Sequence, residues 1–254
     1  MAAAHGEIER QVLGEIWTSD EPYRNLLQLC DGIGHRFGGS ASEHAAAEFL
    51  QRMLREYGLE QVRLEEFPVY SWERGECFFA LSTPVERSFS ALAMPYSGTA
   101  DIEGVIVDVG AGEASDFAEA GDRVRGSIVL TDAETDLPGV EGSHRTDKYR
   151  RAVEGGAIAC VFTNRNPGML RITGALYARN PGGSSALDYT APIPGLGISY
   201  EAGEMIRRLA AHGELRGRIR LRNRVFRSHA YNAVADVPGK DGSSELVLAG
   251  AHYD

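Results

Sequence analysis

The chain has 254 residues, with 26 Lys and Arg against 36 Asp and Glu, which gives a formal net charge of −10. Hydrophobic residues make up 43% and charged residues 24%, a composition that predicts a folded globular chain and excludes a wholly disordered one. The acidic balance argues against nucleic acid or an anionic membrane as a partner, since either would need a concentrated basic face. Cys30, Cys77 and Cys160 are far apart and odd in number, so they predict neither a disulfide framework nor a cysteine-type zinc site.

No apolar stretch approaches the roughly 20 residues that a membrane-spanning helix needs. The N-terminal sequence MAAAHGEIERQVLGEIW carries charges from Glu7 onward and lacks the uninterrupted apolar core of a secretory signal. We therefore expect a cytoplasmic protein with no membrane partner. A misassigned start or a removed leader would give the same sequence in a secreted protein.

The first 60 residues predict three helices. Apolar residues recur at helical spacing over Glu7–Trp17, and a second helix is expected around Pro22, ending before Gly32. A glycine-rich loop, GIGHRFGGSAS, comes next. The third helix has the clearest pattern, with Ser42 as its predicted N-cap and Gly58 as its end.

Strands dominate the sequence from Gln61 onward. An extended, partly alternating stretch continues past Trp72. Further strands are predicted over residues 102–110, 126–132 and 157–164, with a short helix through 147–155, and a strand followed by a helix over 195–213.

The stretch RGRIRLRNRVFR at 216–227 is the one positive cluster in this acidic sequence. Its apolar and charged residues alternate, as in a strand with one exposed face. An exposed edge strand protected by charge explains the cluster without nucleic acid. We therefore expect an edge strand here.

Two more strands are expected after Ser228, at 230–239 and 244–254. Leu246–Ala249 form a nearly continuous apolar run, which is typical of a central strand buried on both faces. The run leads into His-Tyr-Asp at 252–254. Ligand-binding groups gather at the carboxyl ends of strands in α/β sheets, so this tripeptide is the candidate site.

His252 and Asp254 are two residues apart, so their side chains project to the same side of an extended backbone. Neutral imidazole is a good zinc ligand, and a neighbouring carboxylate can fix its tautomer through a hydrogen bond. A strand-end histidine beside an unrelated surface aspartate produces the same short pattern. Spacing alone leaves both interpretations open.

The wider sequence resembles one known family. LVLAGAHYD resembles the strand that carries the first metal ligand in the co-catalytic di-zinc exopeptidases, which include bacterial zinc aminopeptidases and plasma glutamate carboxypeptidase. YNAVADVPG is similar to that family's asparagine-containing strand, and residues 33–67 resemble its N-terminal turn and helix. YSWERGE at 70–76 is closer to the carboxypeptidase branch. Residues 100–225, with VRGSIVL and GAIACVF, look like the protease-associated (PA) insert of many members.

This resemblance implies an α/β fold. It consists of an incomplete zinc-exopeptidase domain, with a mixed sheet flanked by helices, interrupted by a mainly β, α+β PA insert. Residues 1–99 would be the N-terminal part of the peptidase domain, 100–225 the insert, and 226–254 the return to the peptidase domain, ending at the first metal-ligand motif. By the same resemblance, His252 is a ligand to one of two zinc ions and Asp254 is the acid that orients it.

The resemblance also implies metal-assisted hydrolysis. In such enzymes two zinc ions hold a bridging water and lower its pKa, and a carboxylate moves the proton. The family's bridging aspartate, its Glu-Glu pair with the general base, a further acidic ligand and a final histidine follow the first motif, and none can be placed before Asp254. Zinc catalytic sites need about three protein ligands per ion, so His252 alone should hold zinc weakly.

We therefore expect the N-terminal part of a zinc metallo-exopeptidase that acts on a peptide or dipeptide substrate, truncated and inactive as this isolated chain. The choice between aminopeptidase and carboxypeptidase stays open, and so does a homodimer. The alternative is a non-catalytic protein-binding module that uses the PA domain.

Three other chemistry-bearing residues receive structural interpretations. Arg36, beside His35 in the glycine-rich turn, is expected to anchor that loop by hydrogen bonds. Cys30 and Cys160 are expected to pack as small hydrophobic side chains.

The sequence around the predicted insert offers two weaker candidates. His144, Arg145 and Tyr149 are expected at a solvated helix start. GAGEAS at 110–115 lacks the third glycine of a nucleotide-binding fingerprint and is expected to be a strand-to-loop exit.

Overall fold

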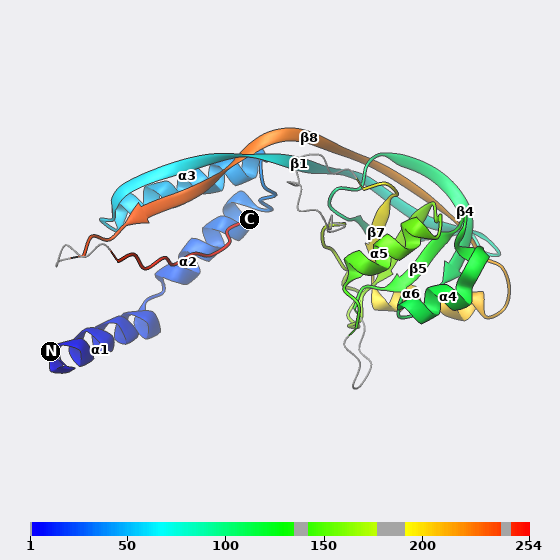
Figure 1. Cartoon of the computed structure of the whole chain (residues 1–254), viewed down its shortest axis with the longest axis horizontal. Helices are drawn as coiled ribbons and strands as arrows, with labels where there is room; N and C mark the ends of the chain where they lie inside the picture. Colours follow the sequence, from blue (N-terminus) through cyan, green and yellow to red (C-terminus); the bar gives the residue numbers. More distant parts are fainter. Residues whose placement is uncertain (1, 135–141, 177–190, 240–244) are drawn as a thin grey trace. The chain divides into compact units, whose positions relative to one another are not determined.

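The computed structural model describes residues 2–134, 142–176, 191–239 and 245–254 (Figure 1). They form two compact units. We call Met1–Phe67 with Ala230–Asp254 the terminal unit, and Pro68–His229 the central unit. Among the described helices, none is long and apolar enough to span a bilayer.

The terminal unit contains the three predicted helices. They are α1 (Ala2–Thr18), α2 (Glu21–Leu27), which continues as a π-helical segment (Gln28–Ile33), and α3 (Ala41–Glu56). Every residue of α2 and of the π-helical segment is at least partly exposed. Cys30 is therefore exposed, and the prediction that it packs as a hydrophobic side chain is wrong.

Helix α3 begins two residues earlier than predicted. Ser40, with an extended backbone, is the N-cap, and its Oγ accepts a hydrogen bond from the Glu43 amide at 3.1 Å. Ser42 lies inside the first turn, where a cap is no longer needed. The helix packs through Ala46, Ala47 and Phe49, and the chain leaves it at Gly58 with a positive φ of 76°.

The described strands form one mixed sheet, as expected for the α/β fold. The strands are β1 (Glu60–Thr83), β2 (Arg87–Phe89), β3 (Ala91–Ala93), β4 (Ala100–Asp108), β5 (Ile128–Asp132), β6 (Ala159–Thr163), β7 (Gly195–Ile198) and β8 (Arg216–Asp236). Their order in the sheet is β2-β1-β8-β4-β5-β6-β7-β3. Strands β4 to β7 are parallel, while β8 pairs antiparallel with β4 and β3 pairs antiparallel with β7.

The central unit has three α-helices among its described residues: α4 (Ala114–Ala120), α5 (Arg145–Glu154) and α6 (Tyr200–Ala210). Helix α4 was not predicted, and it begins within GAGEAS, which was interpreted as a loop exit. Glu113 and Asp116 form a reciprocal capping box there, which satisfies the first amides of a short helix.

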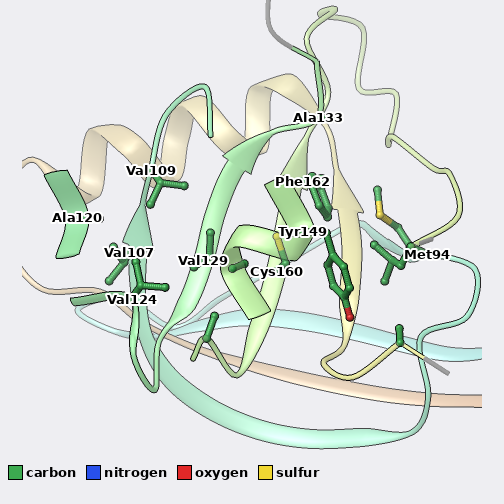
Figure 2. Packing of buried hydrophobic residues seen from close by; sticks show 14 residues of the cluster. Met94, Val107, Val109, Ala120, Val124, Val129, Ala133, Tyr149, Cys160 and Phe162 are labelled. Atoms are coloured by element: carbon green, nitrogen blue, oxygen red, sulfur yellow. The ribbon is translucent and has the colours of Figure 1, made fainter. Parts of the chain in front are cut away.

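A hydrophobic core lies between the parallel strands and helices α4 and α5. Figure 2 shows Val129, Cys160 and Phe162 on the sheet, with Tyr149 and Met94 in the same cluster. Cys160 is fully buried, as predicted, and burial raises the pKa of its thiol.

Tyr149 is not part of a solvated helix start. Its side chain is buried, and its hydroxyl donates to the Ile193 carbonyl oxygen at 2.5 Å and accepts from the Ile193 amide at 3.1 Å. A tyrosine can enter a core when its hydroxyl finds such partners. His144 does lie at the exposed start of α5, where its side chain is the N-cap.

The basic strand is an interior strand, so the prediction of an edge strand is wrong. Strand β8 lies between β1 and β4. Arginines on its exposed face pair with carboxylates of the neighbouring strands: Arg218 with Asp101 at 3.0 Å, Arg220 with Glu76 at 2.6 Å and Arg224 with Glu73 at 2.8 Å. Cross-strand charge pairing explains the basic cluster, because the neighbouring strands supply the opposite charge.

The segment 245–254 has no regular secondary structure, which contradicts the predicted buried central strand. Leu246, Val247 and Leu248 are all exposed. An apolar strand is buried on both faces only between neighbouring strands that carry covering helices. No strand in the described chain pairs with this segment.

Candidate functional site

The structure brings together the two residues of the predicted metal-ligand motif. Nδ1 of His252 lies 2.8 Å from Oδ1 of Asp254. The His252 side chain is 93% exposed. A carboxylate that accepts from Nδ1–H holds the imidazole in the tautomer whose Nε2 lone pair is free. The pair thus presents one imidazole nitrogen in the form that a zinc ion binds.

Tyr253, between them, faces into the terminal unit. Its hydroxyl contacts the Glu43 carboxylate and lies 2.6 Å from the Tyr231 carbonyl oxygen, and it can donate its single proton to one of them at a time. Burial, followed by the hydrogen bond and the charge of Glu43, raises the pKa of Tyr253. The hydroxyl therefore remains a donor throughout the ordinary pH range.

Glu43 is a buried carboxylate at the start of α3, only 1% exposed. It accepts hydrogen bonds from the Gly39 amide at 3.3 Å and from the Tyr231 amide at 3.1 Å, in addition to the Tyr253 hydroxyl. The amide dipoles at a helix N-terminus also favour a negative charge there. Sequence reasoning missed Glu43, although the Ser-x-x-Glu pattern at 40–43 is a helix-start signal that marks it.

Arg36 anchors the glycine-rich turn by hydrogen bonds to backbone oxygens, as predicted. Its Nη1 donates to the carbonyls of Leu29 and Gly34, each at 2.6 Å. Its Nε donates to the carbonyl oxygen of Tyr253, 217 residues away in the sequence. The neighbouring His35 is exposed. Through these hydrogen bonds, Arg36 connects three segments: the π-helical segment that follows α2, the glycine-rich turn, and the candidate site.

The described residues do not complete a metal centre. Among them, no group of three or more His, Cys, Asp or Glu side chains could hold a metal ion. His252 supplies one imidazole, and a catalytic zinc ion ordinarily has about three protein ligands. His252 therefore offers one nitrogen ligand, which is fewer than a zinc site needs.

Comparison with known proteins finds a domain family that matches part of the central unit, and relatives of the chain. Residues 100–206 match the PA domain family. The chain is 26% identical to carboxypeptidase Q of Homo sapiens over 237 residues, which cover 91% of this chain and 48% of that protein. The carboxypeptidase Q of Bos taurus is 25% identical, with the same coverage of 91% and 48%. The chain thus spans about half the length of the curated relatives it matches.

Solved structures of peptidases share this fold. A peptidase M28 precursor from Shewanella amazonensis SB2B has a TM-score of 0.79 at 22% identity, over 98% of this chain and 57% of that one. A zinc aminopeptidase from Bacillus subtilis has a TM-score of 0.58 at 20% identity, over 82% of this chain and 44% of that one. The resemblance to a zinc exopeptidase is confirmed by these relatives together with the PA domain. Residues 100–206 are thus a PA domain, within a chain that is similar in sequence to carboxypeptidase Q and in fold to solved peptidases.

Proposed function

We propose that this chain supplies His252 as one zinc ligand of an exopeptidase that hydrolyses peptide bonds at a chain terminus or in dipeptides. The observation that carries the proposal is the His252–Asp254 contact of 2.8 Å, with the imidazole open to solvent. The sequence comparison also supports the proposal, because the relative that matches 91% of this chain is named carboxypeptidase Q.

Asp254 acts on His252 rather than on the metal. By accepting from Nδ1–H it keeps Nε2 unprotonated, and its negative charge makes the imidazole a better donor to a cation. Zinc bound at such a site polarises a carbonyl and lowers the pKa of a coordinated water. The His252–Asp254 pair does not by itself decide on which chain terminus such an enzyme acts.

We also propose that the 254-residue chain alone hydrolyses no peptide. One imidazole with its orienting carboxylate holds zinc weakly, because the remaining coordination positions are left to water. Release of amino acids from dipeptides by the purified, zinc-loaded chain would refute this part of the proposal.

Zinc titration followed by NMR tests the ligand role. Zinc should shift the imidazole signals of His252 more than those of the other six histidines. His252→Ala should remove the response, whereas His212→Ala, at an exposed histidine after α6, should leave it unchanged. A wild-type chain in which zinc affects other histidines and leaves His252 unperturbed would contradict the assignment.

Reading the gene beyond the codon for Asp254 provides an independent test. An aspartate, a Glu-Glu pair and a late histidine there would supply the ligands and general base that the family resemblance implies. In the protein made from such a gene, His252→Ala should abolish zinc-dependent dipeptide hydrolysis. A stop codon directly after Asp254 would instead favour a binding module.

One feature of the central unit favours that second candidate function. Met169 and Leu170 are exposed at a loop tip that polar contacts hold in place. Glu201 accepts hydrogen bonds from the amides of Gly168 at 2.6 Å and Met169 at 3.1 Å, and Asn164 donates to the Leu170 carbonyl at 3.0 Å. An ordered apolar tip of this kind suits a protein partner with an apolar pocket.

A further inference from the structure

We propose that Glu43 and Arg36 are positioning residues that act through Tyr253 to set the geometry of the His252–Asp254 pair. The inference rests on the proposed function, because it concerns the same metal-ligand pair. It assigns a role to two residues at the start of the chain, 211 and 218 positions before Asp254 in the sequence.

The pair needs positioning from outside its own segment. Two side chains at positions i and i+2 meet on one side only when the backbone between them is extended. Residues 245–254 have no regular secondary structure, and Leu246–Leu248 are exposed. Burial of the preceding apolar run therefore does not hold His252 and Asp254 in place.

The side chain of Tyr253 supplies the first restraint. Its hydroxyl reaches the carboxylate of Glu43, which is already held by the amides of Gly39 and Tyr231. A hydrogen bond to a buried charged group is stronger than one between neutral groups, and losing it leaves that charge less well compensated. Tyr253 is thus drawn to one side of the backbone by the start of α3.

The backbone of Tyr253 supplies the second restraint. Arg36 donates Nε to the Tyr253 carbonyl while Nη1 holds the carbonyls of Leu29 and Gly34. A guanidinium is a planar, rigid fork, so it fixes the relative positions of these oxygens, and a lysine could not reproduce that arrangement. Tyr253 is consequently restrained at both its side chain and its main chain.

Because successive side chains of an extended backbone point to opposite sides, fixing Tyr253 also fixes the side on which its two neighbours lie. With Tyr253 directed toward Glu43, His252 and Asp254 project to the opposite side, where their 2.8 Å contact selects the Nδ1–H tautomer. The imidazole is then oriented before a metal arrives, which is how outer residues raise metal affinity.

The experiment uses the 254-residue chain and the variant Tyr253→Phe, which removes only the hydroxyl. Two-dimensional ¹H–¹⁵N NMR of the imidazoles reports which ring nitrogen carries the proton. The wild type should show the Nδ1–H pattern for the neutral imidazole of His252. Tyr253→Phe should lose that pattern in favour of a mixture with Nε2–H, and its zinc titration at His252 should weaken roughly tenfold, at the lower end of what outer-residue changes cost.

Tyr231→Phe is the matched control. Its hydroxyl lies 3.4 Å from Glu66, whereas the contacts of Tyr231 with Glu43 and Tyr253 come from its backbone amide and carbonyl. This variant should keep the Nδ1–H pattern. Arg36→Lys should lose it, because a single ammonium nitrogen cannot take the places of both Nε, which holds the Tyr253 carbonyl, and Nη1, which holds the carbonyls of Leu29 and Gly34. Unchanged amide signals of α3 in each variant show that the terminal unit stays folded.

Two outcomes are decisive and distinct. If Tyr253→Phe and Arg36→Lys both keep the wild-type tautomer and zinc affinity, the positioning role is refuted. If the variants change the tautomer as expected but zinc leaves wild-type His252 unperturbed, the positioning role is supported and the proposed zinc function fails.

Discussion

Gly197 in β7 is a position where a single methyl group should destabilise the central unit strongly. The strand is interior, and Gly197 pairs with Phe162 of β6 on one side and Leu92 of β3 on the other. A Cβ at this position would lie 1.9 Å from the Ile172 carbonyl oxygen, although ordinary contacts begin near 3.4 Å. Gly197→Ala therefore requires a backbone displacement of about 1.5 Å, the difference between those two distances.

The loss of stability depends on whether the atoms that obstruct the added methyl group can move aside. The nearest obstructing atom, the carbonyl oxygen of Ile172, belongs to the backbone and cannot rotate away as a side chain can. Overpacking a well-packed core costs about 1–3 kcal/mol, and a clash with backbone belongs at the upper end. Gly104→Ala in β4 is the matched control, because its Cβ would meet the Cδ1 end of the Ile158 side chain at 2.8 Å. That side chain can rotate away, so we expect a cost of about 1 kcal/mol or less.

Urea unfolding measured by tryptophan fluorescence compares the two variants. Trp72 is 3% exposed and reports on the central unit, whereas Trp17 is 84% exposed and is removed by Trp17→Phe in every protein compared. We expect Gly197→Ala to lower the free energy of unfolding by about 3 kcal/mol at an unchanged dependence on urea concentration. Equal losses for Gly197→Ala and Gly104→Ala would refute the argument that the Ile172 backbone obstructs the methyl group.

Three further predictions concern reactivity and stability. A thiol reagent at pH 8 should label exposed Cys30 in the folded chain, whereas Cys160 should react only after unfolding, because burial raises the pKa of its thiol. Labelling of Cys30 and Cys160 at the same rate would contradict the burial of Cys160. Arg207→Met should lower the free energy of unfolding by about 2 kcal/mol, because Arg207 pairs with Asp108 at the end of β4 at 3.2 Å and with Asp132 at the end of β5 at 2.7 Å. An unchanged urea midpoint would show that these ion pairs contribute nothing. Ser40→Ala should cost about 1 kcal/mol and Ser42→Ala clearly less, and thermal unfolding with the reverse ranking would place the N-cap at 42.

Local patterns predicted most of the regular elements. The helical spacing before Gly58 and the apolar runs of β4, β5 and β6 are short-range features, so each helix or strand could be located from its own residues. Helix α4 is an exception, because its seven residues depend on the capping box of Glu113 and Asp116 more than on an apolar stripe.

The candidate site also has one feature that the sequence predicted and others that it could not. The spacing of His252 and Asp254 predicted that they would lie on one side, and their contact confirms the geometry. The carboxylate of Glu43 and the guanidinium of Arg36 could not be connected with Tyr253 from sequence, because their contacts join residues more than 200 positions apart. A Ser-x-x-Glu pattern indicates a helix start and says nothing of what else its carboxylate binds.

The sequence by itself determined the position of most helices and strands, and the spacing that lets His252 and Asp254 face the same side of an extended backbone. Those properties depend on residue spacing of two to four positions, which a linear pattern records. Tertiary structure alone decided that β8 is an interior strand, that Leu246–Leu248 are exposed, and that Tyr253 is held by the start of α3. Each of these depends on which distant segment supplies the neighbouring strand, the covering surface or the buried charge, and spacing along one segment carries no information about that neighbour.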